Sequence, residues 1–326
     1  MNSENSAPLH DFSGVHVLVA GDVMIDQYLH GVIERISPEA PVPVVTQRHL
    51  ENRLGGAANV ALNLKAMGAR VSLTGMTGDD EESDTCRQLL LSSDINAQYL
   101  LNFPGRPTTL KTRIMAQGQH VLRIDREQIS YLSQEELASA TAVISNLFET
   151  DCPDVVILQD YNKGFLHPKL VQNIIGMAQD KGIPTVVDPK KWHFEAYRGC
   201  TVFKPNRKEI SEYLNRDIRH FEALVEAHQS LKDVLHHTAS FITLGKDGIF
   251  VAEGDDTSIV PAKAKQIVDV CGAGDTVLSI LALYLVKKLP LQQIARFANA
   301  AGAQVCSKPG VAAINKESFL QEILMD

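Results

Sequence analysis

The sequence predicts an α/β protein whose mostly parallel central sheet lies between two layers of helices, with a small additional β-sheet. Short apolar runs alternate with helix-like segments between residues 71 and 252, as in chains that build parallel sheets. Two stretches, at about residues 28–50 and 107–126, have strand patterns instead, and prolines interrupt the first, which predicts a separate sheet. No linker rich in proline, glycine or serine divides the chain, so we expect one main domain at residues 14–318 after a flexible N-terminus at residues 1–13.

The composition argues against several classes of protein. The 326 residues carry a formal net charge of −8 and no basic block, so nucleic acid is not expected as a partner. Five scattered cysteines without Cys-x-x-Cys spacing predict neither a disulfide framework nor a zinc site, which fits a reducing cytoplasm. The N-terminus lacks the pattern of a signal peptide, and no run approaches the roughly 18 apolar residues that span a bilayer, so we expect neither export nor membrane insertion.

The first predicted strand leads to two candidate binding residues. An apolar run at residues 15–22 predicts a buried strand that ends at Asp22, and Asp26 follows four residues later. Ligands of open parallel sheets bind at the carboxyl ends of the strands, so both aspartates are candidates for substrate contacts. The alternatives are a turn aspartate and a helix cap.

The two strand-rich stretches are predicted to form a lid over the pocket, although an ordinary additional hairpin would give the same pattern. Three cations, Lys111, Arg113 and Arg123, lie in the second stretch. Together with Lys190, which follows a later strand, they favour a negatively charged substrate in an otherwise acidic protein. The alternative is an exposed strand face and a solvated surface lysine.

A helix of small residues lies between the two stretches. Gly55 and Gly56 precede it, and Gly68 ends it. Glycines at a helix start allow a ligand to approach the bare backbone, and the Asn59 side chain offers a donor and an acceptor to a hydroxyl group. Tight packing of the helix is the alternative explanation.

The later elements follow in regular order. Strands are predicted at residues 71–75, 155–160, 184–188, 201–205, 241–245 and 249–252, and helices near residues 80–92 and 168–181 and from about residue 207. Asn206 and Glu209 have the spacing of a capping box, but at the carboxyl end of a strand they can also orient water-bound Mg²⁺ and nucleotide phosphates. The glycine-spaced turn of Thr243, Gly245 and Gly248 either lines a nucleotide or is only a hairpin.

The stretch at residues 269–276 organises the rest of the prediction. It joins two extended segments, at residues 257–261 and 266–269, to an apolar helix at residues 276–286. Gly272 and Gly274 can turn their N–H groups toward one point at the helix start, which makes a cradle for a phosphate. Asp275 at its rim would repel a phosphate unless it accepts a proton from an attacking hydroxyl group. A glycine turn with an aspartate cap is the alternative.

Two catalytic classes lack their motifs. The sequence contains neither GxxxxGK[ST] nor GxSxG, which excludes a P-loop kinase and a hydrolase elbow.

The motifs resemble those of the ribokinase-like (PfkB) sugar kinases over about residues 15–315. The matching sequences, in order, are GGAAN at residues 55–59, Asn-x-x-Glu at 206–209, Thr-x-Gly-x-x-Gly at 243–248 and GAGD at 272–275. Further sequences resemble the heptose 7-phosphate kinase group of this family, namely GDVMID at 21–26, RISPEAPVPV at 35–44, the segments at 112–114 and 123–125, and DYNKG at 160–164. In that group the kinase is often the first half of a bifunctional ADP-heptose synthase.

The resemblance implies a three-layer ribokinase-like fold and an ATP-dependent kinase with Asp275 as the catalytic base and Mg²⁺ bound with ATP. The residues it implies for the nucleotide and its transferring phosphate are Asn206, Arg207, Lys208, Glu209, Thr243, Gly245, Gly248, Gly272, Ala273, Gly274 and Asn299, with Glu209 reaching the metal through water. The residues it implies for a sugar phosphate are Asp22, Asp26, Gly55, Gly56, Asn59, Lys111, Arg113, Arg123 and Lys190, the last four near the phosphate.

The implied reaction is phosphorylation of the C1 hydroxyl of D-glycero-β-D-manno-heptose 7-phosphate to the 1,7-bisphosphate, for ADP-heptose and the lipopolysaccharide core. The resemblance also implies a homodimer formed through the β lid. Because no His-x-Gly-His motif occurs, we expect a separate nucleotidyltransferase to act downstream.

Three positions depart from the pattern of the group. Gln159 stands where a small serine is usual, Cys271 where threonine or alanine is usual, and Lys191, Trp192 and His193 form a bulkier segment near the sugar end. The alternatives are a PfkB-type kinase for another sugar, sugar phosphate or nucleoside, and a non-catalytic sugar-binding protein on the same scaffold. A Rossmann dehydrogenase is disfavoured because the first strand ends in Gly-Asp and not in GxGxxG.

Overall fold

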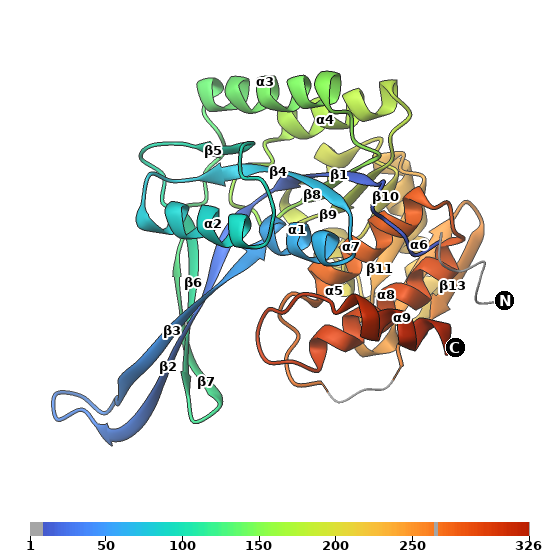
Figure 1. Cartoon of the computed structure of the whole chain (residues 1–326). Helices are drawn as coiled ribbons and strands as arrows, with labels where there is room; N and C mark the ends of the chain where they lie inside the picture. Colours follow the sequence, from blue (N-terminus) through green and yellow to red (C-terminus); the bar gives the residue numbers. More distant parts are fainter. Residues whose placement is uncertain (1–8, 264–266, 326) are drawn as a thin grey trace.

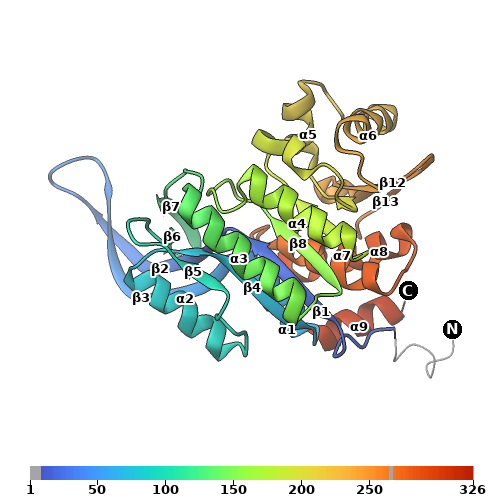
Figure 2. The ribbon, with the colours of Figure 1, turned by 90° about the horizontal axis from the view of Figure 1, so that it is seen from above.

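A nine-stranded sheet runs through the body of the protein, and helices cover both of its faces (Figures 1 and 2). The structure is a computed structural model that describes residues 9–263 and 267–325. In spatial order the strands are β13 (Asp256–Val260), β12 (Ile249–Glu253), β11 (Ala239–Thr243), β10 (Val202–Phe203), β9 (Thr185–Asp188), β8 (Val155–Gln159), β1 (His16–Gly21), β4 (Arg70–Thr77) and β5 (Leu100–Asn102). Neighbouring strands from β11 to β5 are parallel, whereas β12 is antiparallel to both of its neighbours. This topology confirms the predicted fold class.

Two hydrophobic cores lie on opposite faces of the sheet. One core is covered by α1 (Ala57–Ala66), α2 (Glu81–Ser92), α7 (Ala273–Val286), α8 (Leu291–Cys306) and α9 (Lys316–Leu324), and the other by α3 (Gln134–Thr150), α4 (Pro168–Asp180), α5 (Arg207–Leu214) and α6 (Phe221–Leu235). Alternate residues of β1 serve the two cores, with Val17 and Val19 on one face and Leu18 and Ala20 on the other. Because both faces are covered, the strand is apolar along its whole length.

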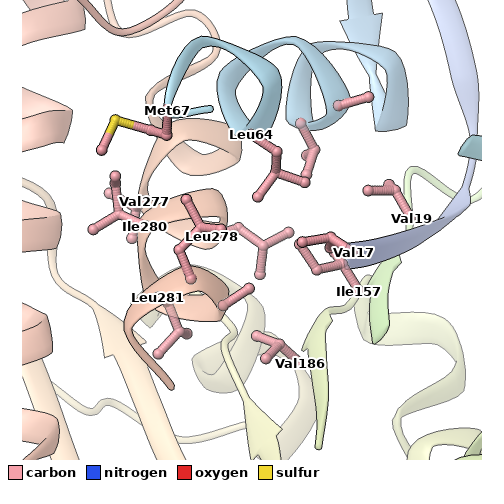
Figure 3. Packing of buried hydrophobic residues seen from close by; sticks show 14 of the residues in the cluster. Val17, Val19, Leu64, Met67, Ile157, Val186, Val277, Leu278, Ile280 and Leu281 are labelled. Atoms are coloured by element: carbon pink, nitrogen blue, oxygen red, sulfur yellow. The ribbon is translucent and has the colours of Figure 1, made fainter. Parts of the chain in front are cut away.

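Helix α7 lies against the middle of the sheet, next to α1 (Figure 3). Every residue from Asp275 to Tyr284 is buried, and a helix buried on all sides needs apolar residues all round. The apolar run that follows Asp275 in the sequence is therefore explained by packing. Its packing fixes the N-terminal end of α7, where Asp275 lies.

A second sheet of four strands projects from the body (Figures 1 and 2). Its strands, in spatial order, are β3 (Pro43–Gly56), β2 (Val23–Ile36), β6 (Thr109–Ala116) and β7 (Gln119–Arg126). β2 continues almost directly from β1, so the chain passes from the central sheet into this smaller one within two residues. The separate β-sheet predicted from the two strand-rich stretches is confirmed, and we refer to these four strands as the lid sheet.

Some elements differ from the expectation. Helices α3, α6 and α9 and strand β5 were not predicted, although Ser133 and Glu136 form a capping box at the start of α3. Residues 1–8 lie outside the described part of the chain, whereas His10 and Phe12, placed by the sequence in a flexible N-terminus, are buried against Tyr284. Residues 267–269 do not form a strand, and Gln266 lies outside the described residues. Within the described residues, no helix has the length and apolar character needed to cross a membrane.

Candidate active site

Asp275 lies in the first turn of α7, where the chain needs glycine to start the helix. Gly272 has a φ of 77°, and a Cβ there would approach Nδ2 of Asn59 to 2.8 Å. The first N–H groups of a helix have no acceptor within the helix, and the dipole of the helix favours an anion at this end. The predicted phosphate cradle of Gly272, Ala273 and Gly274 therefore lies at a helix start, as the sequence indicates.

Three polar side chains donate hydrogen bonds to the Asp275 carboxylate. Asn59 Nδ2 lies 2.7 Å from Oδ2, whereas the Tyr161 hydroxyl and Gln159 Nε2 lie 2.8 Å and 3.2 Å from Oδ1. Burial raises the pKa of Asp275 to about 7, the bonds from Asn59 and Tyr161 oppose this rise, and the charge of Asp188 adds to it. A carboxyl group whose pKa lies near neutrality is suited to accept a proton from a hydroxyl group.

The Tyr161 ring connects Asp275 to two of the predicted cations. Lys111 Nζ and Lys190 Nζ lie 5.5 Å and 5.3 Å from the ring centroid. Lys111 comes from the lid sheet and Lys190 from the end of β9, so three distant parts of the chain meet at this ring. Tyr161 was not predicted as a site residue, although it belongs to the DYNKG sequence.

The four predicted cations differ in their partners. Arg113 pairs with Asp26 in a buried contact, Arg123 pairs with Asp125 at 2.8 Å on an exposed strand, and Lys190 pairs with Glu209 at 2.5 Å. The Lys111 ammonium, by contrast, has a ring contact with Tyr161 but no hydrogen bond or ion pair with any of the described residues. Burial and the nearby charge of Lys163 lower the pKa of Lys111.

Lys163 is a further cation that the sequence did not single out. It is only 8% exposed, and its Nζ lies 2.9 Å from Oε1 of Glu127, whose Oε2 is buried with no partner in the part of the chain that the structure describes. Lys163 lines a small cavity whose other polar lining residues are Asp22, Thr77, Arg106, Thr109 and Gln128.

Asp22 organises the loop that contains Tyr161 and Lys163. Its carboxylate accepts N–H bonds from Tyr161 at 2.8 Å, Lys163 at 2.9 Å and Phe165 at 3.2 Å. Burial, together with the charge of the neighbouring Asp160, raises the pKa of Asp22. The structure thus places Asp22 at the strand end predicted for it and shows that backbone N–H groups already occupy much of its carboxylate.

Gly55 and Gly56 lie where the chain passes from β3 into α1. A Cβ on Gly55 would lie 2.3 Å from Oδ2 of Asp26, and a Cβ on Gly56 would lie 2.3 Å from the carbonyl oxygen of Asp22. Gly56 also has a φ of 58°, which favours glycine. The absence of a Cβ at Gly55 and Gly56 therefore lets Asp26 and Asp22 pack closely against this part of the backbone.

Asn206 and Glu209 form the capping box that the sequence left as an alternative. Asn206 Oδ1 accepts the Glu209 N–H, and Glu209 Oε2 accepts the Asn206 N–H, both at 2.9 Å. Glu209 Oε1 accepts a hydrogen bond from Lys190 Nζ, so Glu209 also contacts one of the residues predicted to bind the substrate. Burial and the charge of Asp188 raise the pKa of Glu209, while Lys190 opposes the rise.

The remaining predicted nucleotide residues lie around β11, β12 and β13. Thr243 forms a β-bridge with Asn206, Gly248 lies against the Val260 carbonyl, and Asn299 Nδ2 donates to that carbonyl at 2.9 Å. Arg207 pairs with Asp247 at 2.9 Å, next to the turn that contains Gly245, whereas Lys208 is exposed. Asn206, Thr243, Gly248 and Asn299 are thus brought together from four elements. Within the described residues, no group of three or more His, Cys, Asp or Glu side chains has the geometry of a metal site.

Two more buried residues near Asp275 escaped the sequence analysis as site residues. Gln159 was noted only as a departure from the family pattern, and Lys204, which forms an ion pair with Asp188 at 3.0 Å, belongs to no motif. Lys204 lies directly before Pro205 and Asn206, at the end of β10, and this position at a strand end is the signal that could have found it.

The whole main domain matches one family model. Residues 16–318 match the model described as pfkB family carbohydrate kinase, and the chain belongs to that family. It is therefore a phosphotransferase that uses an alcohol group as acceptor. This result confirms the resemblance to the PfkB sugar kinases.

Among characterised relatives, the chain is similar to proteins named bifunctional protein HldE. The one from Methylobacillus flagellatus is 40% identical over 310 residues, which are 95% of this chain and 63% of the relative. The one from Desulfatibacillum aliphaticivorans is 39% identical over 326 residues, covering 99% and 66%. The chain thus spans about two thirds or slightly less of the length of these relatives.

Solved structures show the same fold. Phosphofructokinase-2 from Escherichia coli in complex with fructose-6-phosphate has a TM-score of 0.76 and 17% identity, over 95% of this chain and 98% of the other. Ribokinase from Arabidopsis thaliana complexed with ribose and ATP has a TM-score of 0.74 and 17% identity, over 95% and 98%. At this identity the likeness concerns the fold alone.

Proposed function

We propose that the protein is an ATP-dependent kinase that phosphorylates the C1 hydroxyl of D-glycero-β-D-manno-heptose 7-phosphate. The observation that carries the proposal is the position of Asp275, a carboxyl group with a pKa raised to about 7 at the start of α7, in contact with residues from two other motifs, Asn59 and Tyr161. The heptose motifs and the similarity to the HldE proteins support the choice of sugar. We place the reaction in the cytoplasm, in the synthesis of ADP-heptose for lipopolysaccharide.

In this proposal the sugar hydroxyl approaches Asp275 at the start of α7. The carboxylate accepts the hydroxyl proton as the oxygen attacks the terminal phosphate of ATP. The N–H groups of Gly272, Ala273 and Gly274 bind the transferring phosphate group. The Tyr161 hydroxyl donates to Oδ1 of Asp275 and would compete with a bound sugar hydroxyl for this carboxylate.

Asn206 and Glu209 would hold Mg²⁺ through water, and bound Mg²⁺ would offset the negative charge of the phosphates. The residues fit such a role, because Glu209 carries a carboxyl group close to a second one, Asp188, and its Oε1 already accepts a hydrogen bond from one cation, Lys190. Arg207, Lys208, Thr243, Gly245, Gly248 and Asn299 would flank the nucleotide.

The acceptor proposed here carries a phosphate, and the cations suit it. Lys111 is half-buried and forms no ion pair within residues 9–263 and 267–325, and Lys163 lies close enough to lower its pKa. Two cations of like charge in a partly buried site repel each other until an anion binds. We therefore propose Lys111 as the main contact of the sugar phosphate, with Lys163 beside it, and Lys190, Arg113 and Arg123 farther along the site.

We further propose that the lid sheet joins two copies of the chain. Val121, Leu122 and Ile124 on β7 and Ile36 and Val42 at the tip of β2 and β3 are exposed apolar residues, which fits an interface. The product would pass to a nucleotidyltransferase activity.

A panel of acceptors tests the proposed function. Purified protein with Mg-ATP is incubated with heptose 7-phosphate, fructose 6-phosphate, ribose and adenosine, and ADP release and the phosphorylated product are measured. The proposal expects the highest kcat/KM for heptose 7-phosphate. A higher value for another acceptor would replace the sugar but keep the kinase, and no turnover with any acceptor would favour a sugar-binding protein.

A further inference from the structure

Three buried polar side chains, Gln159, Asp188 and Lys204, lie together beside Asp275. Their exposed fractions are 1%, 6% and 2%. They come from the carboxyl ends of β8, β9 and β10, which are successive neighbours in the sheet. Polar groups buried this completely are costly unless they are paired, so the partners of these three residues are informative.

The three side chains form a continuous chain of contacts to the proposed base. Lys204 Nζ lies 3.0 Å from Oδ2 of Asp188. Gln159 Nε2 donates to the same Asp188 oxygen at 3.4 Å and to Oδ1 of Asp275 at 3.2 Å. The backbone N–H of Lys204 donates to the Val187 carbonyl at 2.8 Å, and this bond holds the Lys204 backbone in place.

Packing alone does not explain Gln159. Its nitrogen faces two carboxylates, which can only accept hydrogen bonds when ionised, and its Oε1 is buried with no partner among the described residues. A buried acceptor without a partner costs about 1–3 kcal/mol, and an apolar side chain of similar volume would avoid that cost. The amide is therefore retained at the expense of stability, which indicates a role for its N–H groups.

Several charged and polar groups face Asp275. Asn59 comes from α1, Gln159 and Tyr161 from the end of β8, Asp188 from β9 and Asp26 from β2, and Lys111 and Lys190 lie against the Tyr161 ring. Asp188 and Asp26 both raise the pKa of Asp275. Arg113 pairs with Asp26, and Lys204 pairs with Asp188, so each carboxylate that raises the pKa of Asp275 has its own cation.

We propose that Lys204, Asp188 and Gln159 are positioning residues for Asp275, in which Lys204 neutralises Asp188 and the Gln159 amide separates the two carboxylates and fixes the orientation of the Asp275 carboxylate. This proposal rests on the proposed role of Asp275 as the base. None of the three residues touches the acceptor or the nucleotide in this scheme. They act only through Asp275.

The first test measures the titration of Asp275 without any substrate. The protein is labelled with carbon-13 at the aspartate carboxyl carbons, and the Asp275→Asn variant identifies the Asp275 resonance. Lys204→Met leaves the Asp188 charge uncompensated, so the midpoint of the Asp275 titration moves upward by about one pH unit. Lys204→Arg keeps the cation and leaves the midpoint in place. The double variant Lys204→Met/Asp188→Asn removes both charges, and the midpoint returns toward its original value.

A midpoint that does not move in Lys204→Met, or an upward shift that persists in the double variant, overturns the proposal. If Lys204→Met does not fold, Gln159→Met tests the same chain, because it keeps the volume but removes the donor to Asp275. Its midpoint also moves upward, and an unchanged midpoint overturns the positioning role of Gln159.

The second test uses the preferred acceptor from the panel. The acidic limb of the pH profile of kcat/KM moves in each variant by the same amount and in the same direction as the carboxyl titration. A purely structural role would lower kcat/KM equally at all pH values, and that result also overturns the proposal. Because the titration needs no substrate, absence of turnover with every acceptor would contradict the proposed function alone.

Discussion

The Tyr161 hydroxyl donates a 2.8 Å hydrogen bond to Oδ1 of Asp275, and this bond covers the carboxylate that we propose as the base. Tyr161, two residues after the end of β8, thus contacts the start of α7, 114 residues further along the chain. Gln159, two residues earlier, donates to the same oxygen. Two donors from the end of one strand therefore control which hydrogen bonds the base can still accept.

Removal of the Tyr161 hydroxyl should weaken the enzyme at low pH. The Tyr161→Phe variant keeps the ring that contacts Lys111 and Lys190 but loses a donor that lowers the pKa of Asp275, so that pKa rises. Since the base must be ionised, we expect kcat/KM to fall several-fold at pH 6 and to stay near the original value at pH 8.5. The pH profile of kcat/KM checks this.

Tyr197→Phe is the matched control for this variant. Tyr197 is also buried and donates at 2.8 Å to a carboxylate, that of Asp160, which we do not assign to the chemistry. Its acidic limb should stay in place. Equal shifts in the two tyrosine variants would mean that the Tyr161 hydroxyl has no special relation to the base.

Replacement of Asp275 by asparagine should abolish most turnover without preventing ATP binding. The amide has nearly the same shape but cannot accept the hydroxyl proton, so kcat should fall by ~10²–10⁴. ATP affinity, measured by calorimetry, should change by less than about threefold. Asp255→Asn, at an exposed position between β12 and β13, is the control. An Asp275→Asn enzyme with unreduced kcat would remove Asp275 from the mechanism.

The same substitution should stabilise the protein in a pH-dependent way. Because the folded-state pKa of Asp275 is raised from 3.8 to about 7, the unfolded chain releases this proton more easily. The group therefore favours folding below pH 4, and this contribution is lost as the pH rises to about 7. Asp275→Asn should raise the free energy of unfolding at pH 8, by at most about 4 kcal/mol, and the gain should vanish near pH 4. Denaturant unfolding at both pH values measures the gain, and a gain independent of pH contradicts the explanation.

The sequence predicted the elements whose signals are local. The strand that ends at Asp22, the glycines before α1 and the start of α7 at Asp275 all lie close to the predicted positions, because turns, caps and apolar runs depend on neighbouring residues. The chain of Lys204, Asp188 and Gln159 could not be predicted in this way. It depends on the order and register of three strands, and neither is encoded at any one of these positions.

The cations show the same limit. Lys111, Arg113 and Arg123 lie on alternate or paired positions of the lid sheet, and the sequence treats them alike. Only the structure shows that the two arginines form ion pairs with Asp26 and Asp125, while Lys111 has no carboxylate partner among the described residues. The partner of a charge is a tertiary property, so the sequence alone did not separate them.

An alanine at Gly272 should damage both stability and turnover. Gly272 has a φ of 77°, and the added Cβ would lie 2.8 Å from Nδ2 of Asn59, which donates to Asp275. We expect a loss of stability of about 1–2 kcal/mol and a clear fall in kcat, since Asn59 must move. Gly176→Ala, inside α4 and with open space at the Cβ, is the control and should raise Tm slightly. Thermal unfolding and kcat of both variants test this, and unchanged kcat in Gly272→Ala would show that the Asn59 contact is dispensable.

Lys111 should determine the preference for a phosphorylated acceptor. It is the predicted cation without a carboxylate partner among the described residues, so Lys111→Met creates no unpaired acid and removes only the charge. We expect KM for the sugar phosphate to rise about 10–100-fold, the usual effect of a lost charge-assisted contact, while kcat/KM for the same sugar without its phosphate stays unchanged. The control is Lys65→Met, which removes a partly exposed lysine of α1 that pairs with Asp94. It should leave kcat/KM for both acceptors unchanged. An equal loss of kcat/KM for the two acceptors in Lys111→Met would mean that this lysine supports the lid sheet or Tyr161 and does not bind the phosphate.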